Sequence, residues 1–266
     1  ILDGAMGTEL TRRGVDTHLP LWSAKASMDA PDVVTQIHAD YVAAGAHVLT
    51  ANTFRTNVRA LGKANLAHRA RDLTFTAVAL ARQAALAGNG VQVAGSLAPV
   101  EDCYSPDLVP SEAELDAEHG ELARNLADAG CDFILVETMN TVREAVAGCK
   151  AALVTGLPFW VSFTLDAQNN LISGERIAEA VQAILPLRPQ AVLVNCVPVA
   201  QIADALTKLR AGLGNTALPF GGYGNVGHVD DEVGWTLTHA VSPAAYAEAA
   251  HGWHTLGASI IGGCCG

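Results

Sequence analysis

Three cysteines carry the strongest chemical signal in the sequence. Cys264 and Cys265 are adjacent in the closing segment IIGGCCG, and Cys196 ends the apolar run AVLVNC much earlier in the chain. Zinc binds thiolates in tetrahedral geometry, and a catalytic zinc site typically takes three ligands from the protein and keeps the fourth position exchangeable. Three thiolates give the site a net charge of about −1, so a thiolate bound at the fourth position keeps the electron density that alkyl transfer to sulfur requires. The three residues therefore predict a zinc site that activates a substrate thiol.

Other interpretations of these cysteines stay open at this point. Cysteine is a common small buried hydrophobe, and a lone cysteine in a strand is more often packing than ligand. Cys264 and Cys265 could be two packed thiols, because adjacent strand residues point to opposite faces. They could also form a vicinal disulfide, although such a bond is strained. Gly262, Gly263 and Gly266 favour the zinc site, because glycine lets the backbone leave strand geometry and turn both thiols to one ion. No role is assigned to the remaining cysteines, Cys103, Cys131 and Cys149.

The scaffold that must position these thiols is predicted by the alternation of short β-branched runs with alanine-rich stretches of helical spacing. The predicted strands are residues 1–3, 47–53, 91–98, 133–139, 159–165, 191–196, 220–225 and 258–262. The predicted helices are residues 31–44, 68–87, 111–129, 141–155, 174–185, 200–212 and 242–256. Eight strands separated by seven helices, with no linker between them, predict a single α/β domain over residues 1–266: a (β/α)8 TIM barrel whose eighth helix is missing from the sequence.

Polar or sulfur-containing segments follow most of the predicted strands. The carboxyl ends of all strands lie on one rim of a barrel, where active groups are expected. The segments at these ends are LDGAMGTEL, TANTF, VETMN, VNC, YGN and GGCCG. Because Cys196 closes the sixth predicted strand while Cys264 and Cys265 close the eighth, the barrel brings the three thiols to the same rim.

The amino acid composition argues against several classes of binding partner. The 266 residues include 27 acidic and 16 basic side chains, a formal net charge of −11, which disfavours nucleic acid and anionic membranes. No stretch is apolar and uninterrupted enough to predict a bilayer span, and no signal-peptide pattern follows Ile1. We therefore expect a cytoplasmic protein. Six unevenly spaced cysteines do not predict a disulfide scaffold, and in a reducing compartment clustered thiols indicate metal binding or catalysis.

Several segments, in this order, resemble the homocysteine S-methyltransferase family: DGAMGTEL, AGAHVLTANTF, ETM, NC and IIGGCCG. The resemblance covers nearly the whole chain. ETM alone is a weak signal, but an opening DG-x-x-GTEL, a mid-chain NC and a closing GGCCG are specific in combination. The resemblance implies a zinc-bearing (β/α)8 barrel that transfers a methyl group to the homocysteine thiol and forms methionine, with Cys196, Cys264 and Cys265 as the zinc ligands.

An amino acid substrate needs an anion for its ammonium group and hydrogen-bond donors for its carboxylate. Asp3 and Glu137 could supply the anion. Backbone amides of residues 4–8 could supply the donors, because a glycine-rich turn exposes N–H groups, although GAMG could also be an ordinary turn. Asn52 and Thr53 match the family's second-strand motif and either orient substrate or bond neighbouring strand ends. The predicted homocysteine contacts are Asp3, Gly4, Met6, Gly7, Thr8, Asn52, Thr53, Glu137 and, as a supporting residue, Asn195.

A sulfonium or quaternary ammonium methyl donor is cationic, and aromatic faces hold such groups by about 0.5 to 2 kcal/mol each. The predicted donor contacts are Trp22, Phe54, Tyr104, Tyr223 and Asn225, with Trp235 as a further aromatic candidate. Betaine-using members of the family have an aromatic residue just after the second strand, where this chain has Arg55, whose charge would repel a quaternary ammonium. We therefore expect S-methylmethionine or S-adenosylmethionine as the donor.

Alternatives to this donor and to this function remain. Many family members have YPNSGE near the seventh strand where this chain has YGNVGHVDDEVGW, so no single donor carries over directly. The chain could be a homocysteine module that uses betaine or a methylfolate or corrinoid partner, or a barrel of the family acting on another thiol or selenol. A thiol-binding redox or zinc protein without methyltransferase activity is the alternative from another class.

Overall fold

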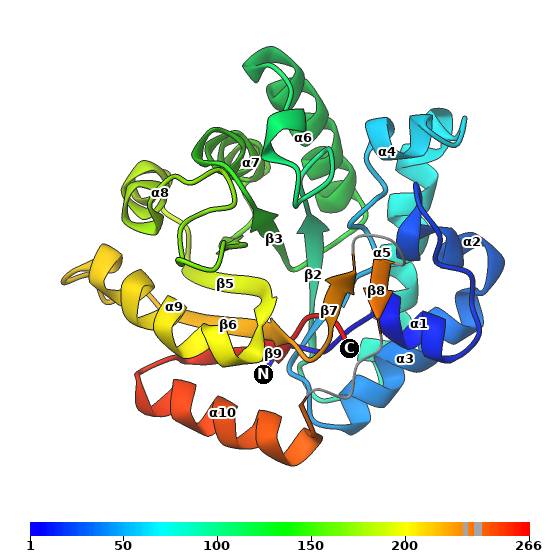
Figure 1. Cartoon of the computed structure of the whole chain (residues 1–266). Helices are drawn as coiled ribbons and strands as arrows, with labels where there is room; N and C mark the ends of the chain where they lie inside the picture. Colours follow the sequence, from blue (N-terminus) through cyan, green and yellow to red (C-terminus); the bar gives the residue numbers. More distant parts are fainter. Residues whose placement is uncertain (231–233, 237–240) are drawn as a thin grey trace.

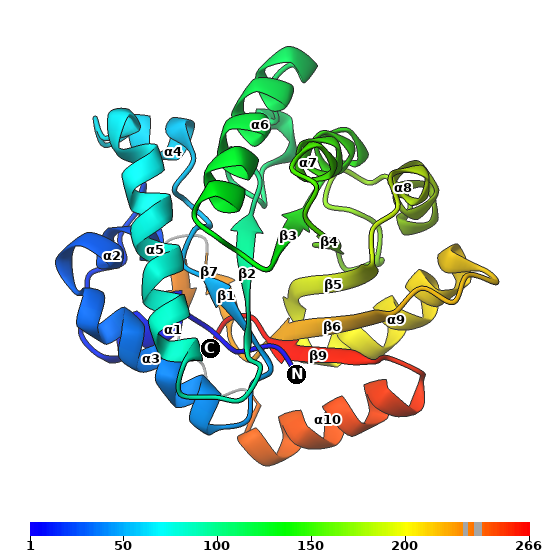
Figure 2. The same cartoon turned by 180° about the vertical axis from the view of Figure 1, so that it is seen from behind.

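Seven parallel strands form the central sheet in a computed structural model that describes residues 1–230, 234–236 and 241–266. The strands are hydrogen-bonded in the order β1-β2-β3-β4-β5-β6-β9, and helices surround the curled sheet (Figures 1 and 2). Their bounds are Val48–Ala51 (β1), Gln92–Leu97 (β2), Phe133–Met139 (β3), Phe159–Phe163 (β4), Ala191–Pro198 (β5), Phe220–Asn225 (β6) and Ile260–Gly263 (β9). Seven of the eight predicted strands are therefore confirmed.

The predicted strand at residues 1–3 is reduced to a single parallel bridge between Leu2 and Val48. This short segment nevertheless bonds to both edges of the sheet. The Asp3 amide donates to the Val48 carbonyl of β1 at 2.9 Å, and the Leu2 amide donates to the Ile261 carbonyl of β9 at 2.9 Å. The first and last strands of the sheet are thus linked through the amino-terminal segment.

Several predicted strand ends differ from the structure by one or two residues. The strands predicted to end at residues 98, 165 and 262 end at Leu97, Phe163 and Gly263, and two further ends differ for a visible reason. The strand predicted over residues 47–53 ends at Ala51, because the Thr53 amide bonds back to the Ala51 carbonyl at 2.7 Å and the chain turns out of the sheet. The strand predicted over residues 191–196 continues to Pro198 instead, with a register shift against β6 between Asn195 and Pro198. Both differences lie at carboxyl ends, where hydrogen bonds to neighbouring segments decide how far a strand extends.

All seven predicted helices are present on the outside of the sheet. They are α3 (Pro31–Ala43), α5 (Ala70–Ala85), α6 (Glu112–Asp128), α7 (Val142–Val154), α8 (Ile177–Ile184), α9 (Val199–Leu213) and α10 (Pro243–Thr255). Local sequence explains their starts: Ser111 and Glu114 form a capping box at α6, and Ser242 caps α10 ahead of a proline. Within the described ranges, no helix has the length and apolar character needed to cross a bilayer.

Short elements that the sequence pattern did not predict lie around the carboxyl ends of the strands. The helices α1 (Gly7–Arg12), α2 (Ala26–Asp29) and α4 (Val58–Gly62) follow the first segment and β1. After β6, the strands β7 (His228–Asp230) and β8 (Gly234–Thr236) form an antiparallel pair. In the view of Figure 1 the three helices lie on the right, and β7 and β8 lie between them and the centre of the sheet.

Apolar packing holds the sheet from both faces, as expected for parallel strands. Its inner face contains a compact cluster of side chains, namely Leu2, Val48, Ala94, Phe133, Leu135, Leu193 and Tyr223. Its outer face contributes to the large core against the helices, in which Trp253 of α10 is the bulkiest fully buried side chain. Burial on both faces fixes the register of each strand and thereby the position of its carboxyl end.

Glycines in β6 allow close approach of the neighbouring backbone. A Cβ atom placed on Gly221 would lie 1.8 Å from the Ile260 carbonyl oxygen of β9, and one placed on Gly224 would lie 3.1 Å from the Val199 Cα atom of α9. The segment FGGYGN is therefore required by packing rather than by turn formation.

Gly221→Ala is expected to lower the free energy of unfolding by about 3 kcal/mol, because the added methyl group forces β6 and β9 apart. Urea denaturation measures the change. The matched control is Gly252→Ala in α10, where an added Cβ meets no atom within 4 Å and alanine favours the helix. Equal stability of the two variants would contradict this account of β6.

Candidate metal and substrate site

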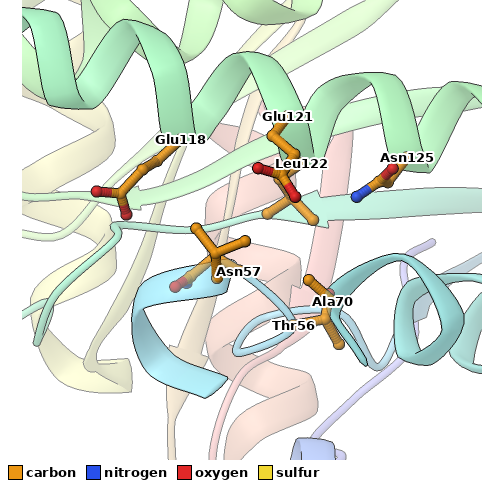
Figure 3. A pocket seen from close by; sticks show the side chains of 8 residues that line it. Thr56, Asn57, Ala70, Glu118, Glu121, Leu122 and Asn125 are labelled. Atoms are coloured by element: carbon orange, nitrogen blue, oxygen red, sulfur yellow. The ribbon is translucent and has the colours of Figure 1, made fainter. Parts of the chain in front are cut away.

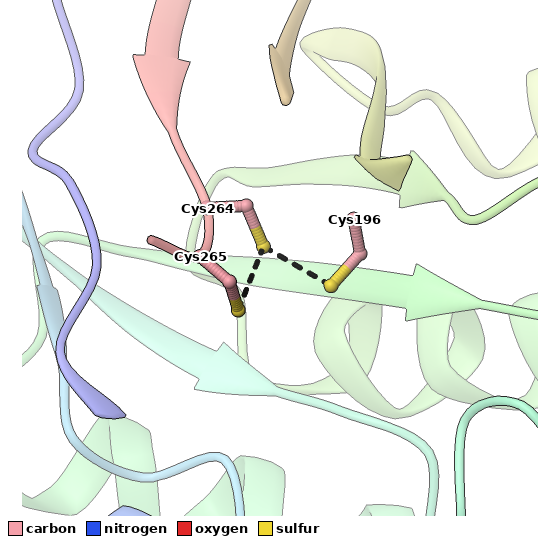
Figure 4. Close-up of side chains that lie close together, drawn as sticks. All are labelled: Cys196, Cys264 and Cys265. Atoms are coloured by element: carbon pink, nitrogen blue, oxygen red, sulfur yellow. Dashed lines mark hydrogen bonds between the residues drawn. The ribbon is translucent and has the colours of Figure 1, made fainter. Parts of the chain in front are cut away.

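Cys196, Cys264 and Cys265 converge at the carboxyl ends of β5 and β9. Their sulfur atoms all lie within 4.8 Å of one another. The Cys264 sulfur is 3.1 Å from that of Cys196 and 4.0 Å from that of Cys265. Figure 4 shows these two contacts as dashed lines. All three cysteines are free thiols in the structure. The expected meeting of the three thiols is thus observed.

An unusual backbone conformation aims Cys196 at the other two thiols. Its φ angle is +59°, in the left-handed region, and it falls within the register shift at the end of β5. This conformation costs free energy for a residue with a side chain, and such strain tends to be retained at functional sites.

Continued hydrogen bonding beyond β9 orients the adjacent pair. The Cys264 amide donates to the Gly224 carbonyl at 2.9 Å, and the Cys265 amide donates to Asn225 Oδ1 at 3.1 Å. The expectation that Gly262 and Gly263 turn the backbone out of strand geometry is wrong, since both lie inside β9. Gly262 is needed for another reason, because a Cβ there would lie 2.7 Å from Leu2 Cβ, whereas a Cβ on Gly263 would meet Gly4 at an ordinary contact distance of 3.5 Å.

The three sulfurs fit a tetrahedral zinc ion. With Zn–S bonds of about 2.3 Å, such a site separates its sulfurs by about 3.8 Å, and the observed 3.1 and 4.0 Å lie on either side of this value. Hydrogen bonds from Cys264 and Cys265 lower the pKa of Cys196 well below the usual thiol value, while the same contacts raise the pKa of Cys264. Three thiolates this close would repel one another strongly, so a bound cation is needed for all three to ionise.

A cavity of about 710 Å³ opens next to the sulfurs. Its walls come from the amino-terminal segment, from α1, and from the loops that follow β1 and β2, with Glu137 and Tyr223 at its inner end. Of the predicted contacts, those that line it are Asp3, Gly4, Met6, Gly7, Thr8, Trp22, Asn52, Phe54, Tyr104, Glu137, Tyr223 and the three cysteines. The volume lies within the range of roughly 300–1,000 Å³ that is typical of small-molecule sites.

Asp3 and Glu137 place two buried carboxyl groups in this cavity. Asp3 accepts hydrogen bonds from the Thr50 amide at 2.7 Å and the Thr50 hydroxyl at 3.0 Å. Glu137 accepts one from the Tyr223 hydroxyl at 2.9 Å and another from the Ser96 hydroxyl. Burial raises the pKa of Asp3 to about 7 and that of Glu137 to about 7, because the protein withdraws both groups from water. A ligand cation between them would favour their charged forms.

Close packing, rather than turn geometry, explains the glycines of the opening DGAMG segment. A Cβ on Gly7 would lie 2.5 Å from the Trp22 indole, and one on Gly4 would lie 2.8 Å from the Tyr41 ring. The Tyr41 hydroxyl donates to the Ala5 carbonyl at 2.8 Å. The segment is therefore held against the cavity wall from two sides, and its backbone lines the cavity.

Four predicted contacts use their side chains to bond neighbouring segments. The Thr53 hydroxyl donates to the Ser96 carbonyl at 2.8 Å, and the Asn52 amide group donates to the Ser23 carbonyl at 2.7 Å. Asn195 Oδ1 accepts from the Ser162 hydroxyl at 2.6 Å. Asn225 bonds the Cys265 amide as described above. Thr53, Asn195 and Asn225 do not line the cavity, so they can act only by supporting it.

Four of the five predicted aromatic contacts line the cavity, and the side chain of the fifth is not described. Trp22, Phe54 and Tyr104 line the cavity, and the Tyr104 hydroxyl lies 3.4 Å from the Cys196 sulfur as a hydrogen-bond donor. Tyr223 also lines it, but its hydroxyl is bonded to Glu137. Trp235 belongs to β8, and its side chain lies outside the part described, as do residues 231–233 of the segment that departs from the family pattern.

Thr50, Ser96, Asp102 and Cys103 also line the cavity but were not predicted to contribute. Thr50 and Ser96 each stand in an otherwise apolar strand, and this break in the pattern is the signal that could have found them. Asp102 and Cys103 follow β2 in a loop whose course the sequence pattern does not determine.

A second hollow lies between the start of α4 and the side of α6 (Figure 3). Glu118, Glu121, Leu122 and Asn125 of α6 form one wall, and Thr56 and Asn57 form the other. The side chains fill it and leave no volume for a ligand. It is a packing contact between outer helices rather than a site.

Comparison with known proteins agrees with this geometry. A family profile described as homocysteine S-methyltransferase matches residues 1–266. The chain is 33% identical to the homocysteine S-methyltransferase of Escherichia coli, with 100% of this chain and 90% of that protein covered. It is 30% identical to the homocysteine S-methyltransferase YbgG of Bacillus subtilis, with 100% and 89% covered. The crystal structure of E. coli MmuM in its metallated form matches with a TM-score of 0.85 at 28% identity, covering 99% of this chain and 90% of that one.

A parallel α/β scaffold with a thiol-lined cavity and these relatives defines an S-methyltransferase enzyme. The chain belongs to the homocysteine S-methyltransferase family, and methyl transfer to homocysteine is the reaction that this membership supports. The resemblance drawn from the sequence motifs is confirmed. The alternative of a thiol-binding protein without methyltransferase activity is wrong.

The raised pKa of Glu137 predicts a specific pH dependence of stability. The folded-state pKa of about 7 lies above the ordinary value of 4.5, so the folded protein retains a proton across this window and the contribution of Glu137 to stability falls as pH rises through it. Between about pH 4 and about pH 8, wild type should lose about 3 kcal/mol of unfolding free energy relative to Glu137→Gln, which cannot ionise.

Urea denaturation of both proteins under reducing conditions tests this difference. Glu248→Gln, on the exposed side of α10, is the matched control for loss of a carboxyl group. A difference between wild type and Glu137→Gln that stays constant with pH would contradict the burial effect.

Proposed function

We propose that this protein is a zinc-dependent enzyme that transfers a methyl group from a cationic sulfonium donor, S-methylmethionine or S-adenosylmethionine, to homocysteine to form methionine. The observation that carries this proposal is the convergence of three thiols beside two buried carboxyl groups in one cavity. Family membership supplies the acceptor. The nature of the donor follows from the aromatic and charged groups of the cavity.

Cys196, Cys264 and Cys265 are the proposed zinc ligands. Zinc bound there would lower the pKa of the homocysteine thiol and hold its sulfur as a nucleophile. The Cys264 and Cys265 amides donate to the Gly224 carbonyl and to Asn225 Oδ1, and these bonds keep the two cysteines in place. The Tyr104 hydroxyl, which donates to Cys196, withdraws charge from that sulfur and orients it.

The amino acid head group of homocysteine is proposed to bind next to the thiols. Asp3 and Glu137 accept its ammonium group, and this contact stabilises their charged forms against burial. Backbone amides of Gly4, Met6, Gly7 and Thr8 are directed to its carboxylate. Asn52, Thr53 and Asn195 support the strand ends from which these contacts come.

Methyl transfer is an in-line displacement. A lone pair of the homocysteine thiolate forms the new S–CH3 bond, while the C–S bond of the donor breaks and its electron pair returns to the donor sulfur. The donor leaves as a neutral thioether, so no protein group needs to donate a proton to it. Trp22, Phe54 and Tyr104 face the cation before transfer and lose this attraction when its charge disappears, which favours release.

The scaffold is proposed to be a single (β/α)8 barrel domain over residues 1–266, in which the bridge at Leu2 takes the place of the first strand. Free thiols at all six cysteines suit a reducing compartment, so we place the reaction in the cytoplasm.

Zinc content gives a direct test of the ligands. The protein purified with zinc should contain one equivalent, and the double variant Cys264→Ser with Cys265→Ser should lose both the metal and methionine formation, because two of its three thiolates are gone. Elemental analysis measures the metal. Cys149→Ala, a buried cysteine of α7 far along the chain from the site, should retain zinc and activity. Full activity in the metal-free double variant would refute the mechanism.

A donor series tests the reaction itself. Methionine formation from homocysteine should occur with S-methylmethionine or S-adenosylmethionine. It should be absent with betaine, because Arg55 repels its quaternary ammonium. It should also be absent with methylated folate or methylated corrinoid, because the aromatic faces suit a small cation. Amino acid analysis detects the product. Activity with betaine, folate or corrinoid but with neither sulfonium would overturn the choice of donor.

A further inference from the structure

One arginine that lines the cavity, Arg55, has no role in the proposed binding of homocysteine. Arg55 follows β1 in the chain and lines the cavity, with its side chain only 11% exposed. Among the residues the structure describes, it makes no hydrogen bond, and its one ion pair there is to Asp102 at 3.8 Å. A largely buried guanidinium with its donors still available is a strong binding group for a carboxylate.

Asp102 stands beside it on the same wall. Its Oδ1 atom is 3.8 Å from the Arg55 guanidinium, and its Oδ2 atom accepts a hydrogen bond from the Ser105 hydroxyl at 2.7 Å. The distance to Arg55 is longer than a hydrogen bond, so each group retains capacity for another partner. The two residues present a positive and a negative group next to each other at the edge of the cavity.

This arrangement matches the head group of an α-amino acid. Such a head group carries a carboxylate and an ammonium on the same carbon, which can face Arg55 and Asp102 respectively. The inner end of the cavity already offers Asp3 and Glu137 for homocysteine, and a volume of about 710 Å³ accommodates more than one small amino acid. The charged groups of the cavity thus form two sets: the buried Asp3 and Glu137, and the pair Arg55 and Asp102, which we call the outer wall because the Asp102 side chain is 43% exposed.

We propose that Arg55 and Asp102 form a second amino-acid-binding subsite that holds the α-carboxylate and α-ammonium of the methyl donor. This inference rests on the proposed function, whose two sulfonium donors both carry an α-amino acid head group, and it assigns residues that bind this head group. Two methylene groups separate the α-carbon of such a donor from its sulfonium centre, so anchoring the head group at the outer wall directs the methyl group inward. Tyr104, next to Cys103 in the same loop, lines the path between this wall and Cys196.

The charges of the subsite favour one orientation of the bound donor as well as its binding. Arg55 repels the positive sulfonium centre while it binds the carboxylate, so the donor is disfavoured in the reversed orientation. Betaine has a carboxylate but no N–H group for Asp102, and its cationic nitrogen would lie close to Arg55. A corrinoid has no head group of this kind.

The test compares S-methylmethionine with two analogues that each lack half of the head group: (3-aminopropyl)dimethylsulfonium, without the carboxylate, and (3-carboxypropyl)dimethylsulfonium, without the ammonium. The zinc-loaded wild type, Arg55→Met, Asp102→Asn and the control Arg69→Met are assayed at saturating homocysteine. Arg69 is an exposed residue that pairs with Asp72 on the outside of the protein.

Wild type and Arg69→Met should prefer S-methylmethionine over each analogue by about 10- to 100-fold in kcat/KM, the range expected for a lost charged hydrogen bond. Arg55→Met should lose the preference over the analogue without the carboxylate and keep the other. Asp102→Asn should do the reverse. The KM for homocysteine should stay within about twofold in both variants, which a general structural defect would not permit.

Two results would overturn the subsite while leaving methyl transfer in place: unchanged donor preferences in both variants, or a selective rise in the KM for homocysteine, which would assign Arg55 to the acceptor. A wild type that transfers no methyl group from S-methylmethionine or S-adenosylmethionine would instead refute the proposed function, and the subsite with it.

Discussion

The mutual repulsion of three thiolates in a confined space is the constraint on which the rest of this structure depends. Three sulfurs within 4.8 Å of one another cannot all ionise without a cation, and the fold must hold them together until one binds. The left-handed conformation of Cys196 and the hydrogen bonds that fix Cys264 and Cys265 provide that rigidity. The fold tolerates the strained backbone of Cys196 and the burial of the thiols, because the large apolar core on both faces of the sheet stabilises the scaffold independently.

The same few backbone atoms link the fold to the site. The segment at Leu2 and Asp3 bonds to β1 on one side and β9 on the other, and the Asp3 side chain points into the cavity beside the thiols. Gly262 permits this close passage of the two chain ends. Because one segment both joins the sheet edges and carries a carboxylate, a change that loosens the joint also moves a group that faces the substrate.

Electrostatics organises the cavity from its inner to its outer end. The inner end collects sulfur and carboxyl groups whose negative charge is unfavourable in the buried, ligand-free state, as the raised pKa values of Asp3 and Glu137 reflect. An ammonium group and a metal ion are the partners that relieve this cost. The more exposed wall carries Arg55 and Asp102, and Trp22, Phe54 and Tyr104 line the same cavity. Such an arrangement favours ligands with positive charge near the thiols and a zwitterionic group farther out.

Sequence alone determined the parts of this protein that depend on local pattern and residue type. Apolar runs and helical spacing correctly predicted seven helices and seven of eight expected strands, because both periodicities are set within each segment. The joining of Cys196 with Cys264 and Cys265 followed from parallel strands having their carboxyl ends on one rim. Tertiary structure decided which way side chains at those ends face: Thr53 and Asn195 bond the framework, whereas Thr50, Ser96 and Asp102 reach the cavity. It also decided that Gly262 serves packing, and that Cys196 takes a left-handed conformation. These features arise from contacts between segments far apart in the chain, which no local pattern encodes.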